Sequence, residues 1–265
     1  MSLPPLLGRR ILVTRAAHQA GKLSQGMRAL GAEPVEVPVL EIHPPASFTP
    51  LDAALRQFAS YDWLILTSAN AVHALVERAA ALGISVSQLA WLKVAAVGAS
   101  TAAEARKAGF KVAFIPQAYV AESLVEGLLQ TLQSKPSGQR ILLARAAVVR
   151  DVIPESLRLA GVAVDVVDAY RNVLPAAAPE QLRCAIRSGI DAVTFTSSSS
   201  ATHLAEAARA ANVAWPIALV PAVSIGPVTS KTLRELGWPP AAEADPSDIP
   251  GLIAAVVRVL RSELI

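Results

Sequence analysis

The chain has 265 residues, a formal net charge of +3 and a hydrophobic content of 53%. This length suits two domains of roughly 100 to 150 residues each. The apolar residues come in short runs, none of which reaches the ~20 residues of a membrane span, and the N-terminus is too short for the apolar core of a signal peptide. A single cysteine, Cys184, excludes a disulfide within the chain. We expect a cytoplasmic protein that spans no membrane.

Charge and motif patterns exclude further classes of function. Lysine and arginine form no long runs and are not interleaved with aromatic residues, so no nucleic-acid partner is expected. The histidines lack the spacing of metal ligands, and no glycine-rich phosphate loop is present. We therefore expect neither a metal nor a nucleotide cofactor. Acidic small molecules are not excluded as partners. The histidines are His18, His43, His73 and His203.

The first forty residues predict a strand, a helix and a second strand. Ile11–Thr14 is the first strand, and Ala17–Leu30 has the apolar spacing of a helix that Gly31 would end. Val35–Val39 is the second strand. Four prolines then fall between residues 38 and 50, which is unfavourable for an interior strand and typical of a linker. A domain boundary near residue 45 follows from this change.

Strands and helices then alternate along the chain, which predicts parallel sheets with right-handed crossovers. A strand around Val164–Tyr170 matches Val35–Leu40 in pattern, and the segment with Pro175 and Pro179 resembles a second linker. The elements expected between the two linkers are helix Leu51–Phe58, the strand after Asp62, helix Asn70–Ala81, strand Val94–Val97, helix Thr101–Ala108, strand Val112–Ile115, helix Glu122–Leu132 and strand Ile141–Ala144.

The sequence repeats itself with a period of about 130 residues. Asp62–Val72 (DWLILTSANAV) returns as Asp191–Ala201 (DAVTFTSSSSA), 129 residues later. ILVTRAA at residues 11–17 returns as ILLARAA at 141–147, and VGAST at 97–101 returns as IGPVT at 225–229. Three segments that recur in the same order indicate duplication of a whole α/β unit, because this period is too long for a solenoid repeat.

Small polar residues follow the predicted strands at four recurring positions. Ligands of open α/β sheets bind beyond the carboxyl ends of the strands, and helix N-termini at these ends favour anions. The alternative is that these hydroxyls are ordinary helix N-caps. Arg15 and Arg150 would add positive charge at the same edge. The four positions are Thr67-Ser68, Gly98–Thr101, Thr196-Ser197 and Gly226–Thr229.

Taken together, these motifs resemble those of the uroporphyrinogen-III synthase family over nearly the whole chain. The family often has proline after the first Thr-Arg, where this chain has Ala16, and the serine run at 197–200 is unusually uniform. Neither departure removes a group that the chemistry requires. The motifs are VTR (Val13–Arg15), ILTSANAV (Ile65–Val72), VGASTA (Val97–Ala102), DAYR (Asp168–Arg171), FTSSSS (Phe195–Ser200) and IGPVT (Ile225–Thr229).

The resemblance implies two parallel-sheet α/β domains of similar topology, joined by a two-stranded β-ladder. Domain 1 would be discontinuous and combine residues 1–36 with 175–265, and domain 2 would be inserted as residues 46–162. Residues 37–45 and 163–174 would form the connecting ladder. The resemblance also places the active cleft between the domains and implies a monomer.

The implied substrate is hydroxymethylbilane, a linear tetrapyrrole with eight carboxylates, received by hand-over from hydroxymethylbilane synthase. The implied reaction removes the ring A hydroxyl as water and closes the macrocycle with ring D inverted, and it needs no cofactor and no metal. Tyr170 is the candidate catalytic proton donor, with a tyrosine that only packs as the alternative. The resemblance carries over carboxylate-binding roles to Arg15, Ser68, Thr101, Arg150, Ser197 and Thr229.

Two other classes of function fit two α/β domains. A clamp of the periplasmic-binding type would close on an anion without transforming it, but the lack of a signal peptide argues against this class. A two-domain glycosyltransferase is the second alternative, but the sequence offers no acidic and basic pair suited to a nucleotide-sugar. Formation of the III isomer from hydroxymethylbilane would distinguish the synthase from both.

Overall fold

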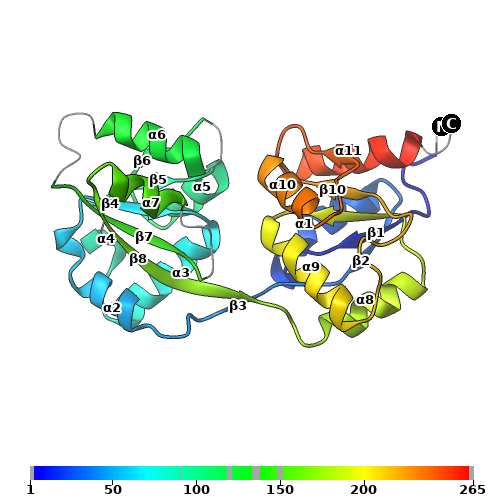
Figure 1. Cartoon of the computed structure of the whole chain (residues 1–265), viewed down its shortest axis with the longest axis horizontal. Helices are drawn as coiled ribbons and strands as arrows, with labels where there is room; N and C mark the ends of the chain where they lie inside the picture. The colour runs from blue at the N-terminus through cyan, green and yellow to red at the C-terminus, as the bar shows by residue number, and fades with distance from the viewer. Residues whose placement is uncertain (1–2, 90, 118–120, 133–137, 148–151, 263–265) are drawn as a thin grey trace. The chain divides into compact units, whose positions relative to one another are not determined.

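The computed structural model describes residues 3–89, 91–117, 121–132, 138–147 and 152–262, without the side chains of 17–19 and 262. The chain divides into two compact units, which are considered separately below (Figure 1). Unit 1 combines Met1–Glu41 with Val173–Ile265, and unit 2 is Ile42–Asn172. None of the described helices is long and apolar enough to cross a lipid bilayer.

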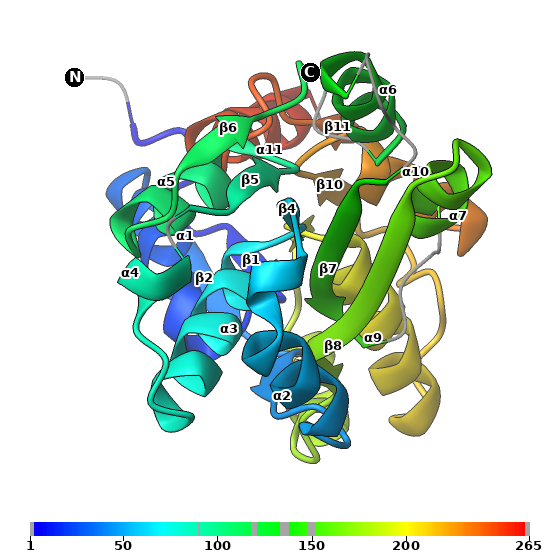
Figure 2. The same cartoon turned by 90° about the vertical axis from the view of Figure 1, so that its left-hand side faces the viewer.

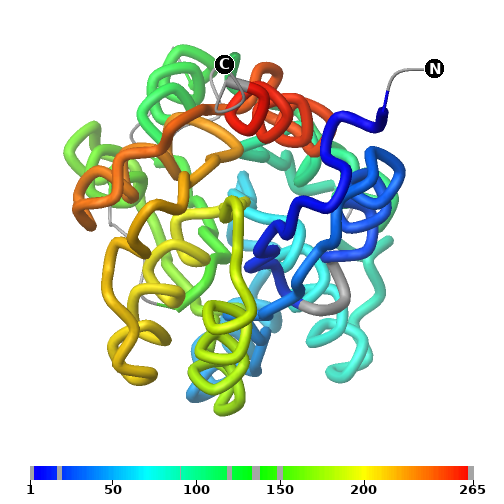
Figure 3. Tube along the Cα trace, turned by 90° about the vertical axis from the view of Figure 1, so that its right-hand side faces the viewer, coloured from blue at the N-terminus to red at the C-terminus, as the bar shows by residue number. Residues whose placement is uncertain are grey.

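Unit 1 contains a five-stranded parallel sheet in the order β11-β10-β9-β1-β2. Numbered along this unit, the order is 2-1-3-4-5, which is a common order for doubly wound sheets. Figure 3 shows the blue start of the chain beside the orange and red end. The strands are β1 (Arg10–Val13), β2 (Glu33–Glu36), β9 (Ala192–Phe195), β10 (Ala222–Ser224) and β11 (Ala242–Glu243).

Helices cover both faces of the unit 1 sheet because alternate strand residues point to opposite sides. Leu12 and Phe195 pack with α8, α9 and α10, whereas Ile11 and Val13 pack with α1 and α11. Each face thus has its own apolar core. The helices are α1 (Ala17–Ala29), α8 (Ala178–Arg187), α9 (Ser198–Ala210), α10 (Pro227–Glu235) and α11 (Ile249–Ser262).

Unit 2 contains a six-stranded sheet in the order β3-β8-β7-β4-β5-β6, in which β4 to β8 are parallel (Figure 2). The strands are β3 (Glu41–His43), β4 (Trp63–Leu66), β5 (Lys93–Ala96), β6 (Val112–Phe114), β7 (Arg140–Ala146) and β8 (Ala163–Val173).

The unit 2 sheet is also covered on both faces. Leu64 and Leu66 pack with α2 to α5, whereas Trp63 and Ile65 pack with α6 and α7. The helices are α2 (Thr49–Arg56), α3 (Ala69–Ala81), α4 (Val86–Leu89), α5 (Ala99–Lys107), α6 (Ala121–Thr131) and α7 (Val152–Leu159), with a 3₁₀ turn at Phe58–Ser60.

Neither unit coincides with one sequence repeat. The first repeat supplies β1 to β6, and the second supplies β7 to β11. Unit 1 nevertheless pairs β1 with β9, and unit 2 pairs β4 with β7. Each unit therefore combines the first part of one repeat with the second part of the other. The duplication is present in both sheets, but neither unit is one contiguous repeat.

Most element boundaries differ from the sequence prediction by one to three residues, and two of the differences have a clear local cause. The second strand ends at Glu36 rather than Val39, although Val37 and Val39 still donate backbone hydrogen bonds to β1 and its C-terminal neighbour. Pro38 lies between them and has no N–H to donate, which interrupts the strand. Helix α5 begins at Ala99 rather than Thr101, because Gly98 takes the extended N-cap conformation.

The predicted connecting ladder remains a prediction. The structure has β3 and β8 as hydrogen-bonded neighbours in the unit 2 sheet, and the chain passes between the two units at residues 41/42 and 172/173.

An aspartate fixes the central strand pair of each sheet. Asp62 accepts a hydrogen bond from the backbone N–H of Arg140 through Oδ2 at 2.8 Å, and its own N–H donates to the Arg140 carbonyl. Asp191 makes the same two contacts with Arg10, with the side-chain bond at 2.7 Å. The repeated aspartate thus holds the first residue of a neighbouring strand.

We predict that Asp62→Ala lowers the free energy of unfolding by about 1 to 3 kcal/mol, because it leaves the partly buried Arg140 N–H without this acceptor. Asp191→Ala should have a cost in the same range. Urea unfolding measures both. Asp168→Ala, an exposed β8 position, is the control and should change stability by less than about 0.5 kcal/mol. Equal costs at all three positions would contradict the proposed role.

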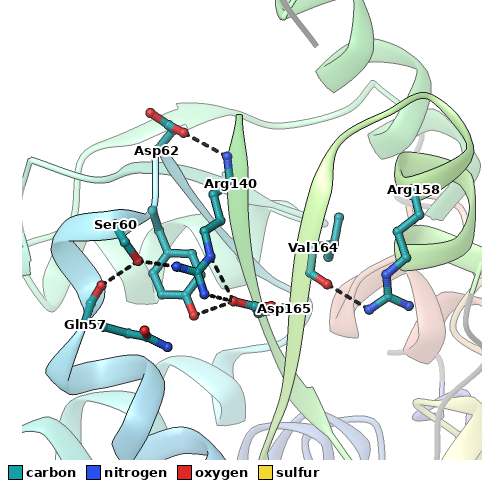
Figure 4. A network of polar contacts seen from close by, with 8 residues as sticks. Gln57, Ser60, Asp62, Arg140, Arg158, Val164 and Asp165 are labelled. Atoms are coloured by element: carbon teal, nitrogen blue, oxygen red, sulfur yellow. Dashed lines mark hydrogen bonds and ion pairs between the residues drawn. The ribbon is translucent and has the colours of Figure 1, made fainter. Parts of the chain in front are cut away.

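A polar network lies beside this pair in unit 2 (Figure 4). Asp165 on β8 accepts hydrogen bonds from the Tyr61 hydroxyl at 2.7 Å and from Arg140 at 2.7 and 3.1 Å. Arg140 also donates to Ser60 Oγ at 2.8 Å and lies over the Tyr61 ring. Burial, followed by the bond to Asp165, raises the pKa of Tyr61 to about 12. The Tyr61 phenol is therefore neutral at physiological pH and can donate to the carboxylate.

The carboxyl group of Asp165 should make the stability of the fold depend on pH in the acidic range. Burial raises its pKa, but the hydrogen bonds from Tyr61 and Arg140 and the Arg140 charge outweigh burial and hold the pKa below the ordinary 3.8. A depressed pKa stabilises the fold above the unfolded-state value, and the benefit is lost as pH falls through the folded-state value.

We therefore predict that Asp165→Asn is less stable than the parent above pH 4, and that the difference shrinks below it. The side chain is 44% exposed, so solvent screening should limit the effect to about 1 kcal/mol. Urea midpoints between pH 6 and 3 measure it. A constant difference across this range would contradict the proposed titration.

Candidate functional site

The candidate residues gather at the carboxyl ends of neighbouring strands within each unit. In unit 1, Arg15, Ser197 and Thr229 follow β1, β9 and β10, which are adjacent in the sheet. In unit 2, Ser68 and Thr101 follow the adjacent strands β4 and β5. In each sheet the chain proceeds toward opposite edges from two neighbouring strands. These strands are β1 and β9 in unit 1, and β4 and β7 in unit 2. Ligands of open α/β sheets bind at such switch points.

Ser68 and Ser197 both cap a helix. Ser68 Oγ accepts a hydrogen bond from Ala71 N at 3.1 Å at the start of α3. Ser197 Oγ accepts one from Ser200 N at 3.1 Å, and Ser200 Oγ accepts one from Ser197 N, which completes a capping box at α9. Each serine oxygen is thus engaged by its own helix, and each hydroxyl proton is a further donor.

Thr101 and Thr229 occupy a different position. Each is the third residue of its helix, after a glycine N-cap, Gly98 or Gly226, that makes no side-chain cap. The first-turn N–H groups of α5 and α10 therefore receive no acceptor from the capping residue, as an anion site requires. Both threonines are only 4% exposed.

Tyr170 lies beside Ser68, 102 residues away in the chain. The phenol and Ser68 Oγ are 3.0 Å apart, and the side chain of Asn70 also acts to lower the pKa of the phenol. The register between β7 and β8 shifts after Arg145, so that Ala146 pairs with Tyr170. Irregularities of this kind change the direction of a side chain. Unit 2 therefore brings the candidate acid and one candidate binding residue together.

Burial shifts the pKa of the candidate tyrosine and the pKa of the candidate arginine in opposite directions. It raises the pKa of the Tyr170 phenol, and the hydrogen bonds from Ser68 and Asn70 offset this only in part. It lowers the pKa of the half-buried Arg15 guanidinium. The phenol thus keeps its proton at neutral pH. Arg150 lies outside the residues that the structure describes.

The N-termini of α9 and α10 are joined by hydroxyl groups. Thr232 Oγ1 donates to Ser198 Oγ at 2.9 Å, and Ser198 Oγ donates to the Val228 carbonyl at 3.3 Å. Ser198 and Val228 directly neighbour the candidates Ser197 and Thr229 in the chain. In unit 2, the corresponding helices α3 and α5 are joined by His73 and Glu104, whose Nε2 and Oε2 atoms are 2.9 Å apart. Neighbouring helix N-termini are therefore held together in both units.

Sequence reasoning missed a second polar chain in unit 1. Ser224 Oγ lies 2.6 Å from Ser230 Oγ, which donates to the Glu243 carboxylate. Both serines are fully buried. The positions 128 residues earlier are Ala96 and Ala102, so the polar chain belongs to one unit only. This difference between the repeats was its only signal in the sequence. Asn70 was also missed, because no local sequence pattern links it to Tyr170.

Other polar clusters do not form a recognisable centre. Within the described ranges, no group of three His, Cys, Asp or Glu side chains is arranged to hold a metal ion. A surface hollow of about 350 Å³ lies at α3 and α5 and is lined by residues such as His73, Glu77 and Lys107. It contains none of the candidate residues.

Comparison with known proteins decides the family. The family model described as uroporphyrinogen-III synthase HemD matches residues 21–254. A uroporphyrinogen-III synthase from Synechococcus elongatus is 38% identical over 98% of this chain and 99% of its own length. The chain belongs to the uroporphyrinogen-III synthase family. This membership favours the synthase over the anion clamp and the glycosyltransferase.

Solved structures of uroporphyrinogen III synthases show the same fold. One from Thermus thermophilus has a TM-score of 0.69 at 22% identity, with 96% of this chain and 100% of that chain covered. One from Helicobacter pylori has a TM-score of 0.62 at 19% identity, with 95% and 99% covered. The predicted class of two parallel-sheet α/β domains is confirmed.

We predict that Ser197→Ala lowers the free energy of unfolding by about 0.5 to 2 kcal/mol, and that Ser197→Gly costs only a few tenths. Alanine removes the capping oxygen without a replacement, whereas glycine leaves the helix terminus open to water. Urea unfolding of both variants measures the difference. Equal costs for the two variants would show that Ser197 contributes to stability by something other than capping.

Proposed function

We propose that this protein is a cofactor-independent uroporphyrinogen-III synthase, a hydro-lyase of haem biosynthesis. It converts hydroxymethylbilane into uroporphyrinogen III, with loss of the ring A hydroxyl as water and inversion of ring D. The observation that carries this proposal is the likeness to a uroporphyrinogen-III synthase over 98% of the chain. The cytoplasm is the proposed location, and a monomer that receives its substrate from hydroxymethylbilane synthase is the proposed working form.

The substrate carboxylates are proposed to bind Arg15, Ser68, Thr101, Arg150, Ser197 and Thr229. Support comes from the position of the described members at carboxyl ends of strands, where helix N-termini favour anions by roughly 0.3 to 2 kcal/mol each. The glycine-capped termini of α5 and α10 offer backbone N–H groups at Thr101 and Thr229. Several weak anchors on one flexible ligand hold its reacting ends in a productive orientation.

Tyr170 is proposed as the proton donor to the departing ring A hydroxyl. Its raised pKa keeps the phenol protonated at neutral pH, so a proton is available. The pyrrole nitrogen of ring A assists the departure of hydroxide, so the donor needs to supply only part of the driving force. General-acid help is typically worth about 10² to 10⁴-fold, and the lower end suits a substrate that already activates its leaving group.

Isomer analysis tests the proposed function. The protein is incubated with freshly generated hydroxymethylbilane, and the oxidised porphyrin isomers are resolved. The III isomer should form well above the background of heat-inactivated protein, in which spontaneous closure gives the I isomer. Formation of the I isomer alone would overturn the proposal.

We predict that Tyr170→Phe lowers turnover by about 100-fold, because it removes the acid but leaves the carboxylate anchors in place. The variant should still give mainly the III isomer after background subtraction, since ring inversion depends on orientation rather than on the phenol. Rate and isomer ratio are measured together. Full activity would show that Tyr170 only packs, and a fast variant that yields the I isomer would show that Tyr170 positions ring D.

A further inference from the structure

We propose that Ser68 and Asn70 are positioning residues that hold the oxygen of Tyr170 and stabilise it after its proton has left. This inference rests on the proposed function, because it assigns a task to residues around the proposed acid. The phenol lies 3.0 Å from Ser68 Oγ, Asn70 acts to lower its pKa, and Tyr170 is 6% exposed. For Ser68 this role, exerted through Tyr170, replaces the carboxylate-binding role proposed above, and the other five residues keep theirs.

Hydrogen-bonding capacity supports this assignment. A phenol has one proton to donate and two lone pairs that accept. Ser68 Oγ accepts from Ala71 N–H with a lone pair, so its own proton is available for the Tyr170 oxygen. The Asn70 amide has two N–H groups that can serve as a second donor. Ser68 and Asn70 both favour the ionised phenol against the opposing effect of burial. With its lone pairs held in this way, the phenol can direct its proton at a substrate oxygen.

The proton balance closes without a further reactant. The O–H bond of Tyr170 breaks as its proton passes to the ring A hydroxyl, which leaves as water with the electron pair of its C–O bond. The resulting phenolate is a buried anion, which is costly without donors. Ser68 and Asn70 supply those donors. The proton that the product releases when the macrocycle closes then restores the phenol.

The other unit contains a natural comparison for this arrangement. Ser197 caps α9 with the geometry that Ser68 has at α3, with the same 3.1 Å to the third residue of the helix. The residue 129 positions after Asn70 is Ser199, and the residue 130 positions before Tyr170 is Leu40. Unit 1 therefore has the matching helix cap, but it has no phenol at the position that matches Tyr170. The cap serves the fold in both units, whereas the contact to an acid belongs to unit 2.

Titration of the phenol tests the inference without substrate. The chain has three tyrosines, so protein carrying ¹³C at the tyrosine Cζ gives few signals, and Tyr170→Phe identifies that of Tyr170. We expect Ser68→Ala and Asn70→Ala each to raise the ionisation midpoint of Tyr170 by about one pH unit, because each removes a donor to the phenolate. Ser197→Ala, which removes the matched cap of unit 1, should leave that midpoint unchanged. An unchanged midpoint in both unit 2 variants would overturn the proposal.

Kinetics separate a positioning role from direct binding. Ser68→Ala and Asn70→Ala should lower kcat about tenfold with KM within about twofold, and Ser68→Thr, which restores a hydroxyl, should recover most of the loss. In a Tyr170→Phe background, neither alanine change should slow turnover further, because groups that act through one residue are not additive. A further tenfold loss in that background would overturn the proposal by showing that Ser68 or Asn70 contacts substrate directly.

Two controls keep the outcomes distinct. Ser68→Gly removes the hydroxyl but costs little helix stability. If this variant is slow and yet unfolds at the same urea concentration as the parent, the loss of rate is due to the missing hydroxyl and not to a weakened helix. If the parent protein forms no III isomer, the proposed function fails, while the ¹³C titration still decides whether Ser68 and Asn70 hold the phenol.

Discussion

The pairing of a strand from one repeat with a strand from the other is the constraint on which both sheets depend. In unit 1 this pair is β1 with β9, and in unit 2 it is β4 with β7. Asp191 and Asp62 fix the two pairs through the backbone N–H groups of Arg10 and Arg140. Because the strands are parallel, fixing them at the amino end also sets which residues meet at the carboxyl end. The contact between Asp191 and Arg10 therefore sets the neighbouring positions of Arg15 and Ser197, one strand length away.

The site chemistry is divided between side chains and backbone. Ser68 and Ser197 use their oxygens to cap helices, and the threonine hydroxyls are nearly buried. What remains for an anion is chiefly the set of N–H groups at glycine-capped helices, whose orientation is fixed by the helix itself. Such groups carry no titratable proton. In the proposed reaction, proton transfer would depend on Tyr170, whose burial raises its pKa and whose polar neighbours Ser68 and Asn70 oppose that effect.

The sequence predicted local features well and long-range pairings poorly. Short apolar runs bounded by Asp, Gly and Ser located most strands, because a strand buried on both faces leaves that pattern. The repeated Asp62 and Asp191 were recognised only as residues preceding strands, since their acceptor role depends on strands that are distant in the chain. The contact of Ser68 with Tyr170 spans 102 residues and has no local signal. Likewise, the repeat predicted two similar units, but two copies of one pattern do not specify which halves pair.

The exchanged pairing has a consequence for how the chain folds. In a contiguous arrangement of the first repeat, β1 and β2 would occupy the edge of β4 that β7 and β8 occupy in unit 2. The residue pairs formed in the strand register differ between the observed and the contiguous arrangement. Leu142 pairs with Asp165, and Leu12 pairs with Val35 at the matching position. Tyr61 would therefore face a valine in the contiguous arrangement and lose the carboxylate that accepts its hydroxyl proton at 2.7 Å. A polar contact that only one of two arrangements can form would favour that arrangement and so add specificity to its modest contribution to stability.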